Sequence, residues 1–387
     1  MRALPSKRVN GVSAWLWRAM GCVVAAVCVG VAMPSASAAQ LPGVTSTPVR
    51  PYSTLLAVDS RTNQVYVRTL GLIYGQGYPG VGAGYTALDG TSGHILRIWD
   101  DTTWVNVSKP PPFGFARTDN GLRVVFPPSP LYTAMPSPAL LAMEARYGFG
   151  VGQGTMVADQ AGKLVAILDT SAKAGAYSTK LWIFDAPLTR LHATITLSKE
   201  PLALAFDFKA NRILVMYLDS TQIFTLANLH YLATISHPVY LEAPLIAGYD
   251  NRMYDTDPVA VDTTLGRAVV VSGSYEQATI QIIDLVTRRV LRTLSLGTQP
   301  IAVQIDPVLH RAYILDHGFC EVNVLDLRSE KLVANVGVGQ SSSSLAVDVP
   351  TGKAFVSSPG VPTSHVLIFP ANTTMNEAGC WPQAYQQ

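Results

Sequence analysis

The stretch that decides the fold runs from Pro258 to Ser272 and reads PVAVDTTLGRAVVVS. It places two short apolar runs on either side of a turn that begins with an aspartate, which is typical of two antiparallel β-strands. An apolar run closed by an aspartate recurs along the chain at intervals of roughly 40 to 60 residues, and such a period predicts small sheets that stack on one another. The aspartates of the repeated pattern are Asp59, Asp119, Asp159, Asp207, Asp262, Asp306 and Asp348.

The unit that starts at Pro258 contains four predicted strands. They cover residues Val259 to Val261, Ala268 to Ser272, Thr279 to Ile283 and Arg289 to Leu294. Short strands rich in Val, Ile and Leu and separated by Gly, Pro and Asp favour an antiparallel meander. Each unit is therefore expected to form one small sheet.

A second regularity lies four residues after the aspartate. In the five clearest units this residue belongs to a type that tolerates left-handed backbone geometry in a turn. The residues at this position are Asn63, Asn211, Gly266, His310 and Gly352. This position predicts that His310 is a turn residue rather than a ligand.

The last unit has three predicted strands and no fourth one after Pro370. Residues 44–50, which precede the first unit, are free to supply the missing outer strand. Closure by the two ends would leave no open sheet edge between the first and last units. The sequence thus predicts an all-β fold, a seven-bladed β-propeller of four-stranded antiparallel blades whose ring is closed by the N-terminal strand.

The first 38 residues have the pattern of a secretory signal peptide. Basic residues precede an apolar run from Ala19 to Met33, which is followed by Pro34 and the small residues before Ala38. The run is shorter than the roughly 20 residues that span a bilayer, which argues against a membrane anchor. Cys22 and Cys28 admit a lipoprotein as an alternative, but neither follows a usual lipobox. We expect cleavage after Ala38 and a periplasmic or secreted protein with no membrane span after cleavage.

Composition limits the possible partners. Charged residues make up 14% of the chain and hydrophobic residues 48%, which excludes a disordered protein. The signal segment carries four of the 28 basic residues and none of the 26 acidic ones, so the mature protein is slightly acidic. Since no basic stretch remains, nucleic acid is not expected as a partner. The predicted organisation is a signal peptide (1–38), a propeller (39–370) and a C-terminal tail (371–387).

Two cysteines remain after cleavage, Cys320 and Cys380. In an oxidising compartment two cysteines usually pair, which predicts a disulfide that ties the tail to the sixth unit. Two unrelated buried thiols are the alternative. The tail after Pro370 is predicted to have no strand pairing of its own.

The sequence resembles the YVTN-type β-propeller repeat proteins of bacterial periplasms and surfaces. The stretches Pro300 to Val303, Tyr313 to Asp316 and Val322 to Asp326 follow the repeat of that family. Further copies are Pro258 to Asp284 and Leu345 to Phe369. The resemblance implies the propeller fold. It leaves the function open, because the family includes binding proteins, assembly factors and subunits of periplasmic dehydrogenases.

Motifs for catalysis or metal binding are scarce. The histidines lie in different units and lack metal-ligand spacing. Asp250, Asp255 and Asp257 could hold Ca²⁺ but do not have the spacing of an EF-hand, so no cofactor is predicted and Ca²⁺ stays a weak alternative. Residues Gly148 to Gly154 are interpreted as a linker between blades, and Ser341 to Ser344 as a polar connecting loop.

Long insertions point to one face of the molecule, which we call the loop-rich face. In a four-stranded meander, the connection from strand two to strand three and the link to the next unit emerge on the same side. The insertions 70–85 and 240–257 fall on such connections and carry residues that often contact ligands. The candidate ligand-binding residues are Tyr249, Arg252, Tyr254, Asp255, Asp257, Tyr74 and Tyr78. Loops without a binding role are the alternative.

Two functions remain open. The first is an exported, non-catalytic binding or assembly module that holds a small ligand or a protein partner on the loop-rich face. The alternative is a periplasmic enzyme or enzyme subunit, such as a dehydrogenase component or a hydrolase, with its active site at the central tunnel. Asp316 and His317 are then the candidate acid–base residues. The competing interpretation of Asp316 is a carboxylate that caps a turn.

Overall fold

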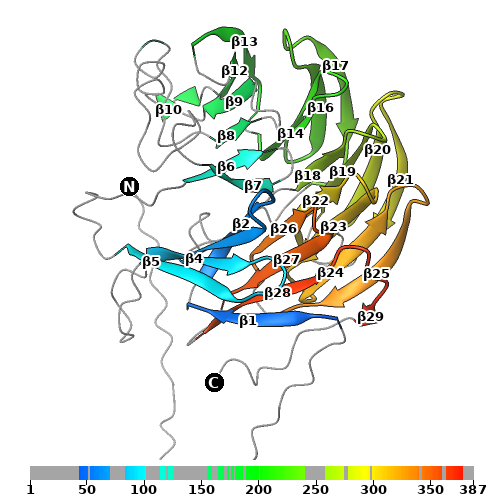
Figure 1. The fold of residues 1–387 in the computed structure, drawn as a ribbon. Coiled ribbons are helices and arrows are strands. Elements are labelled where there is room, and N and C mark those ends of the chain that lie inside the picture. Colours follow the sequence, from blue (N-terminus) through cyan, green and yellow to red (C-terminus); the bar gives the residue numbers. More distant parts are fainter. Residues whose placement is uncertain are drawn as a thin grey trace, which may run out of the picture. The chain divides into compact units, whose positions relative to one another are not determined.

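The structure is a computed structural model (Figure 1), and all residues that it describes belong to one compact unit, Ala38–Gln387. Every element among them is a β-strand. Within this described part, no helix has the length and apolarity to cross a membrane. The described ranges are 43–50, 53–69, 83–101, 114–118, 121–125, 146, 155–158, 164–169, 172–173, 176–177, 179–185, 189–199, 201–239, 258–273, 278–296, 299–339, 342–359 and 363–377.

The fourth and fifth units form four-stranded antiparallel meanders. Strands β14 to β17 cover Ala203–Asp207, Arg212–Met216, Ser220–Thr225 and Tyr231–Ser236. Strands β18 to β21 cover Val259–Asp262, Arg267–Ser272, Thr279–Asp284 and Arg289–Ser295. The fifth unit contains the stretch from which the fold was predicted, and its strands match the predicted ranges to within one residue.

The sixth unit has the predicted four strands and one more. Strands β22 to β25 cover Pro300–Asp306, Arg311–Asp316, Glu321–Asp326 and Lys331–Gly337. A fifth strand, β29 (Asn376–Glu377), pairs in parallel with β25. The prediction that the tail after Pro370 has no strand pairing of its own is therefore wrong. Two polar residues give no β signal, and an edge on the neighbouring unit supplies the partner.

The last unit pairs with the N-terminal strand. Strands β26 to β28 cover Ser344–Asp348, Lys353–Ser358 and Ser364–Pro370. Strand β1 (Thr45–Val49) pairs antiparallel with β28 as the fourth strand of this sheet, where the sequence placed residues 44–50. Val44 and Val49 are 2% and 6% exposed, so apolar packing holds this segment in addition to its hydrogen bonds.

The first three units depart from the prediction of separate blades. They share one ten-stranded sheet, in which short parallel ladders connect β2 to β7 and β6 to β8. The second unit contributes only the pair β6–β7 among the described residues. The repeat around Asp119 is weak, and each of these two strands is only five residues long. The strands are β2 Ser53–Asp59, β3 Gln64–Thr69, β4 Ala83–Asp89, β5 Ile95–Asp101, β6 Gly114–Thr118, β7 Gly121–Val125, β8 Thr155–Ala158, β9 Leu164–Asp169, β12 Thr179–Asp185 and β13 Leu191–Leu197, beside a separate hairpin of β10 Ala172–Lys173 and β11 Ala176–Tyr177.

The hydrophobic core is a series of clusters, most of which are shared by two sheets. Phe206 lies in a cluster between the third and fourth units, and Val270 in one between the fourth and fifth. Further clusters join the fifth to the sixth unit and the sixth to the last. A cluster that contains Leu56 and Phe355 packs the first sheet against the last. Since each sheet is apolar on both faces, no unit could bury its residues alone.

The turn residues have the predicted backbone geometry. Asn63, Asn211 and His310 have φ angles of 52°, 54° and 54°, and Gly266 and Gly352 have 67° and 63°. The left-handed conformation is thus present at all five predicted positions. His310 is a turn residue, as expected.

Hydroxyl groups connect the last sheet to the first. The Oγ atoms of Ser344 and Ser364 accept hydrogen bonds from the backbone N–H groups of Leu56 (3.2 Å) and Ser53 (3.0 Å). Ser342, Ser343 and Ser344 are at most 1% exposed. Ser342 and Ser343 precede β26 and belong to no strand, as interpreted, but they are buried, and Ser344 is already the first residue of β26.

Candidate binding groove

The predicted site residues fall mostly outside the described part of the chain. Asp316 and His317 are described, whereas the candidate ligand-binding residues of the loop-rich face are not. The residues outside the described ranges are Tyr74, Tyr78, Tyr249, Arg252, Tyr254, Asp255 and Asp257, and the Ca²⁺ candidate Asp250 also lies there.

Asp316 has a structural role at the end of β23. Its carboxylate is fully buried and accepts hydrogen bonds from the N–H groups of Gly318 (2.9 Å) and Phe319 (3.1 Å). His317 lies beside it, with Nδ1 at 3.1 Å from the carbonyl oxygen of Ser342. Asp316 is thus a turn-capping carboxylate, the alternative that the sequence left open.

Two of the repeated aspartates act in the same way. Oδ1 of Asp262 accepts from the N–H groups of Thr264 and Leu265, each at 2.9 Å. Asp306 caps its turn through Val308 and Leu309. These carboxylates are at most 1% exposed. Asp262 and Asp306, like Asp316, therefore stabilise the turns that follow their strands.

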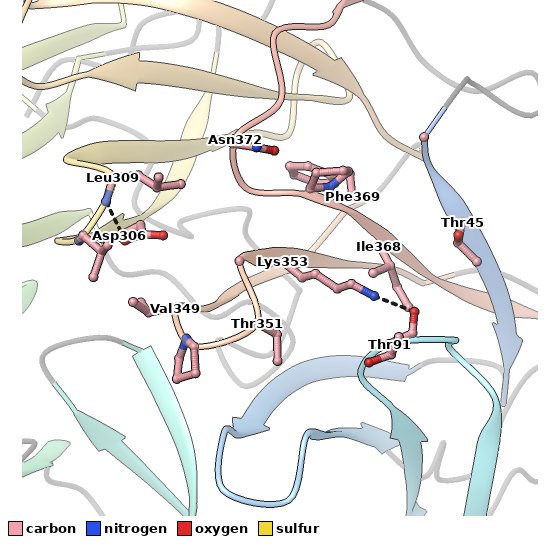
Figure 2. A pocket seen from close by; sticks show the side chains of 15 residues that line it. Thr45, Thr91, Asp306, Leu309, Val349, Thr351, Lys353, Ile368, Phe369 and Asn372 are labelled. Carbon is pink, nitrogen blue, oxygen red and sulfur yellow. Dashed lines mark hydrogen bonds between the residues drawn. The ribbon is translucent and has the colours of Figure 1, made fainter.

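The described part of the chain contains a groove of about 590 Å³. The turns between strands one and two of the last two units line it, together with β1 and the β4–β5 turn. Figure 2 shows these elements around the cavity, with Thr351 and Lys353 near its middle. The lining residues include Thr45, Thr91, Asp306, Val308, Leu309, Val349, Pro350, Thr351, Lys353, Ile368, Phe369 and Asn372.

The groove combines an apolar floor with polar groups. Ile368 and Phe369 are buried beneath it, whereas Val308 is 69% exposed at its margin. Oδ1 of Asp306 accepts from the N–H groups of its own turn, at Val308 and Leu309. The surface can hold a ligand by apolar contact and hydrogen bonding. None of the sequence-predicted sites includes this groove, because it forms only where turns of several units meet.

The side chain of Lys353 reaches from the last unit to the first at this groove. Its Nζ donates to the carbonyl oxygen of Thr91 at 2.5 Å (Figure 2). The N–H group of Ser92 and, to a lesser extent, the charge of Lys353 lower the pKa of Asp89. The ammonium group is therefore already engaged with the first unit.

Equivalent cations connect other neighbouring units. Lys353 is the first residue of its unit's second strand, and Arg212, Arg267 and Arg311 hold the same position in theirs. Arg212 donates to the carbonyl oxygen of Leu285, and Arg267 to that of Leu327. Arg311 donates to Ala371 (3.2 Å) and Thr373 (2.8 Å). Each bond joins one unit to the next, and we call these residues the inter-unit cations.

We expect stability to decrease when the pH falls from about 7 to about 5. Burial lowers the pKa of His237 and of His365, so the unfolded chain, with a histidine pKa near 6.5, binds more protons in this range. Asp284 affects stability only at lower pH. The N–H group of Thr287 lowers the pKa of Asp284, so its contribution to the free energy of unfolding is lost only near pH 4 and below. Urea unfolding at pH 7.5 and 5.5 measures the effect.

A variant identifies the source of this pH effect. Replacing His365, whose Nδ1 lies 3.1 Å from Oγ of Ser46 on β1, by Gln should reduce the acid-induced loss. His94 is exposed, so His94→Gln is the matched control and should leave the loss unchanged. Equal stability of the wild-type protein at both pH values would contradict the prediction.

Comparison with known proteins establishes the fold. No family model matches the chain, and no curated protein matches it. Among solved structures, the WD40 domain of Neurospora crassa Pan2 is similar, with a TM-score of 0.50 and 10% identity over 87% of this chain and 98% of that one. The WD40 domain is a β-propeller, so the likeness identifies the fold of this chain as a β-propeller. At this identity it says nothing of function.

The described part of the chain contains no group of three or more His, Cys, Asp or Glu residues arranged to hold a metal ion. The expected Ca²⁺ alternative involves residues outside that part.

Proposed function

We propose that this protein is an exported binding or assembly module that holds a protein partner or a small ligand on its loop-rich face. The capping role of Asp316 carries the proposal. This carboxylate was the candidate acid–base group, and two backbone N–H groups already occupy it. A rigid propeller with binding residues on its loops is a common arrangement for such a function.

The proposed architecture is a closed ring of seven blades of the YVTN type. The inter-unit cations support this architecture. Arg212 contacts the fifth unit, and equivalent contacts join the fifth unit to the sixth, the sixth to the last, and the last, through Lys353, to the first. Packing of Leu56 against the last sheet and the pairing of β1 with β28 add to this support.

Removing an inter-unit cation should destabilise the protein. Arg311→Met leaves the carbonyl oxygens of Ala371 and Thr373 without this charged donor, which should reduce the free energy of unfolding by about 2 kcal/mol. Arg328→Met is a matched control, because that side chain is exposed. Denaturant unfolding measures both variants, and equal midpoints for them would contradict a structural role of Arg311.

Export requires removal of the signal segment. We expect a mature N-terminus of Ala39-Gln40, measured by mass spectrometry of the exported protein. A lipid attached to Cys22 or Cys28, or an intact N-terminus in the exported protein, would contradict this prediction.

We also propose that Cys320 pairs with Cys380. Cys320 is a disulfide-bonded residue of the described part, which supports the pairing, whereas Cys380 lies outside that part. The side chain of Cys320 is buried in the turn between β23 and β24, in a left-handed conformation with a φ of 56°.

Site-specific photo-crosslinking tests the proposed binding face. A photoreactive residue at position 254 should capture a partner in the native exporting host, whereas the same residue at position 351, in the groove, should not. Capture through position 351 alone would move the site to the groove. Turnover of a substrate that Asp316→Asn abolishes in a protein with unchanged melting temperature would favour the enzyme instead.

A further inference from the structure

The outer strand of the fifth unit has an unusual surface for an edge strand. In β21, Arg289 to Thr293 are all exposed, and this run includes Val290 and Leu291, at 37% and 39%, and Arg292. β21 is the last strand of its sheet and pairs only with β20 among the described strands (Figure 1). Its outer edge thus combines unpaired backbone groups with cationic and apolar side chains.

Cations from the sixth unit extend this surface. The inter-unit cation Arg267 lies opposite Asp284, and Asp284 lies opposite Arg289. Arg267 also pairs with Glu330 at 3.1 Å, which ties the hairpin that carries the exposed residues Arg328 and Lys331 to the fifth unit. We call Arg289, Val290, Leu291, Arg292, Arg328 and Lys331 the cationic rim.

Nearby acidic groups offset only part of the charge of the cationic rim, since Asp284 is the cross-strand partner of Arg289 and Asp326 that of Lys331. The carboxylate of Asp284 accepts hydrogen bonds from the N–H groups of its own turn, and that of Asp326 does the same. Glu330 is paired with Arg267. None of the four rim cations forms an ion pair with a residue of the described part. The rim therefore presents a positive charge on a protein whose overall charge is close to zero.

Positive charges on an edge strand can simply prevent aggregation, a role for which lysine is typical. Here, three of the four cations are arginines, which bind carboxylates in a bidentate manner and keep their charge in a contact. The neighbouring sheet supplies a precedent for an added strand. β29 pairs with the outer strand β25 and places the acidic Glu377 beside it.

We propose that the cationic rim docks an extended acidic segment of a protein partner, which adds a strand to the edge of β21. A register shift leaves Leu291 without a partner on β20, so Arg289 and Arg292 lie on one face of the sheet and Val290 on the other. Carboxylates of the segment pair with Arg289 and Arg292, and its alternate apolar residues contact Val290. Main-chain hydrogen bonds contribute affinity and the side chains contribute specificity. β21 carries none of the candidate residues of the loop-rich face, so this test is independent of the proposed function.

The test uses an eight-residue peptide that alternates Glu and Val, with a Lys–Val peptide as its control. Binding to the mature protein is measured by calorimetry in about 0.1 M salt, where exposed charges still attract one another. We expect the acidic peptide alone to bind. The double variant Arg289→Glu/Arg292→Glu should weaken binding at least ~10-fold, because repulsion replaces attraction. The matched control is Arg190→Glu, at an exposed position before the outer strand of the third unit. This variant should bind the acidic peptide with the affinity of the mature protein.

Amide hydrogen exchange provides a second readout. The bound peptide should slow exchange within residues 289–295, and melting curves should show that the variants are folded. If the charge-reversed protein does not fold, Arg289→Gln/Arg292→Gln replaces it. The proposal is overturned if the acidic peptide does not bind, if charge removal leaves its affinity unchanged, or if β21 gains no protection. Stronger binding to phosphatidylserine vesicles through the same arginines would also overturn it, in favour of a membrane.

Discussion

Deleting residues 39–50 from the mature protein should lower its melting temperature by roughly 10 °C. The deletion removes β1, whose residues pair with β28 from Thr45↔Ile368 to Val49↔Ser364. It also removes the buried side chains of Val44 and Val49. Each such valine contributes about 1.5–3 kcal/mol, and the edge of β28 would become open for association with other chains. Differential scanning calorimetry measures the shift.

Deletion of residues 39–42 alone is the matched control, because it leaves β1 intact. We expect this shorter deletion to melt within a degree or two of the mature protein. The same melting temperature for both deletions would mean that β1 does not hold the last sheet, and that closure through the N-terminal strand is wrong.

Loss of the proposed Cys320–Cys380 disulfide should reduce the free energy of unfolding by about 2–4 kcal/mol. The two cysteines enclose nearly 60 residues, and the bridge restricts the unfolded chain. Cys380→Ser and Cys320→Ser should give similar losses in denaturant unfolding. A reducing agent should destabilise the wild-type protein by the same amount and leave either variant unchanged.

Two contacts should hold part of the C-terminal tail in place after the disulfide is reduced. The carbonyl oxygen of Ala371 accepts from the hydroxyl of Tyr313 at 2.6 Å, and β29 holds Asn376 and Glu377 against β25. We therefore expect faster hydrogen exchange on reduction only beyond Glu377, rather than from residue 370 onward. Alkylation of both cysteines in unreduced, denatured material would contradict the disulfide.

The sequence was sufficient to predict strands and turns where residues close together in one unit determine them. The strands of the fifth unit and the left-handed turns at Asn211 and Gly266 depend on apolar runs, an aspartate and a tolerant residue four positions later. The same geometry occurs at Arg288 and Glu330, which have φ angles of 58° and 59°. Neither residue type indicates a left-handed backbone, so these two turns could not be predicted.

Contacts between units were not predictable from the sequence. Arg267 reaches a carbonyl oxygen 60 residues away, and β29 needs the edge of β25 as its partner. The groove likewise forms only where turns of several units meet. In each case the partner is determined by how one sheet stacks on the next, which a single sequence does not specify. The predicted residues of the loop-rich face remain a hypothesis for the binding site.

A crystal structure of the exported protein is the most direct test of the central claim. The account predicts seven blades around one axis, with residues 45–49 paired to residues 364–368 and the ammonium group of Lys353 bonded to the carbonyl oxygen of Thr91. A ring of six or eight blades, or an N-terminal segment that lies apart from the last sheet, would contradict it.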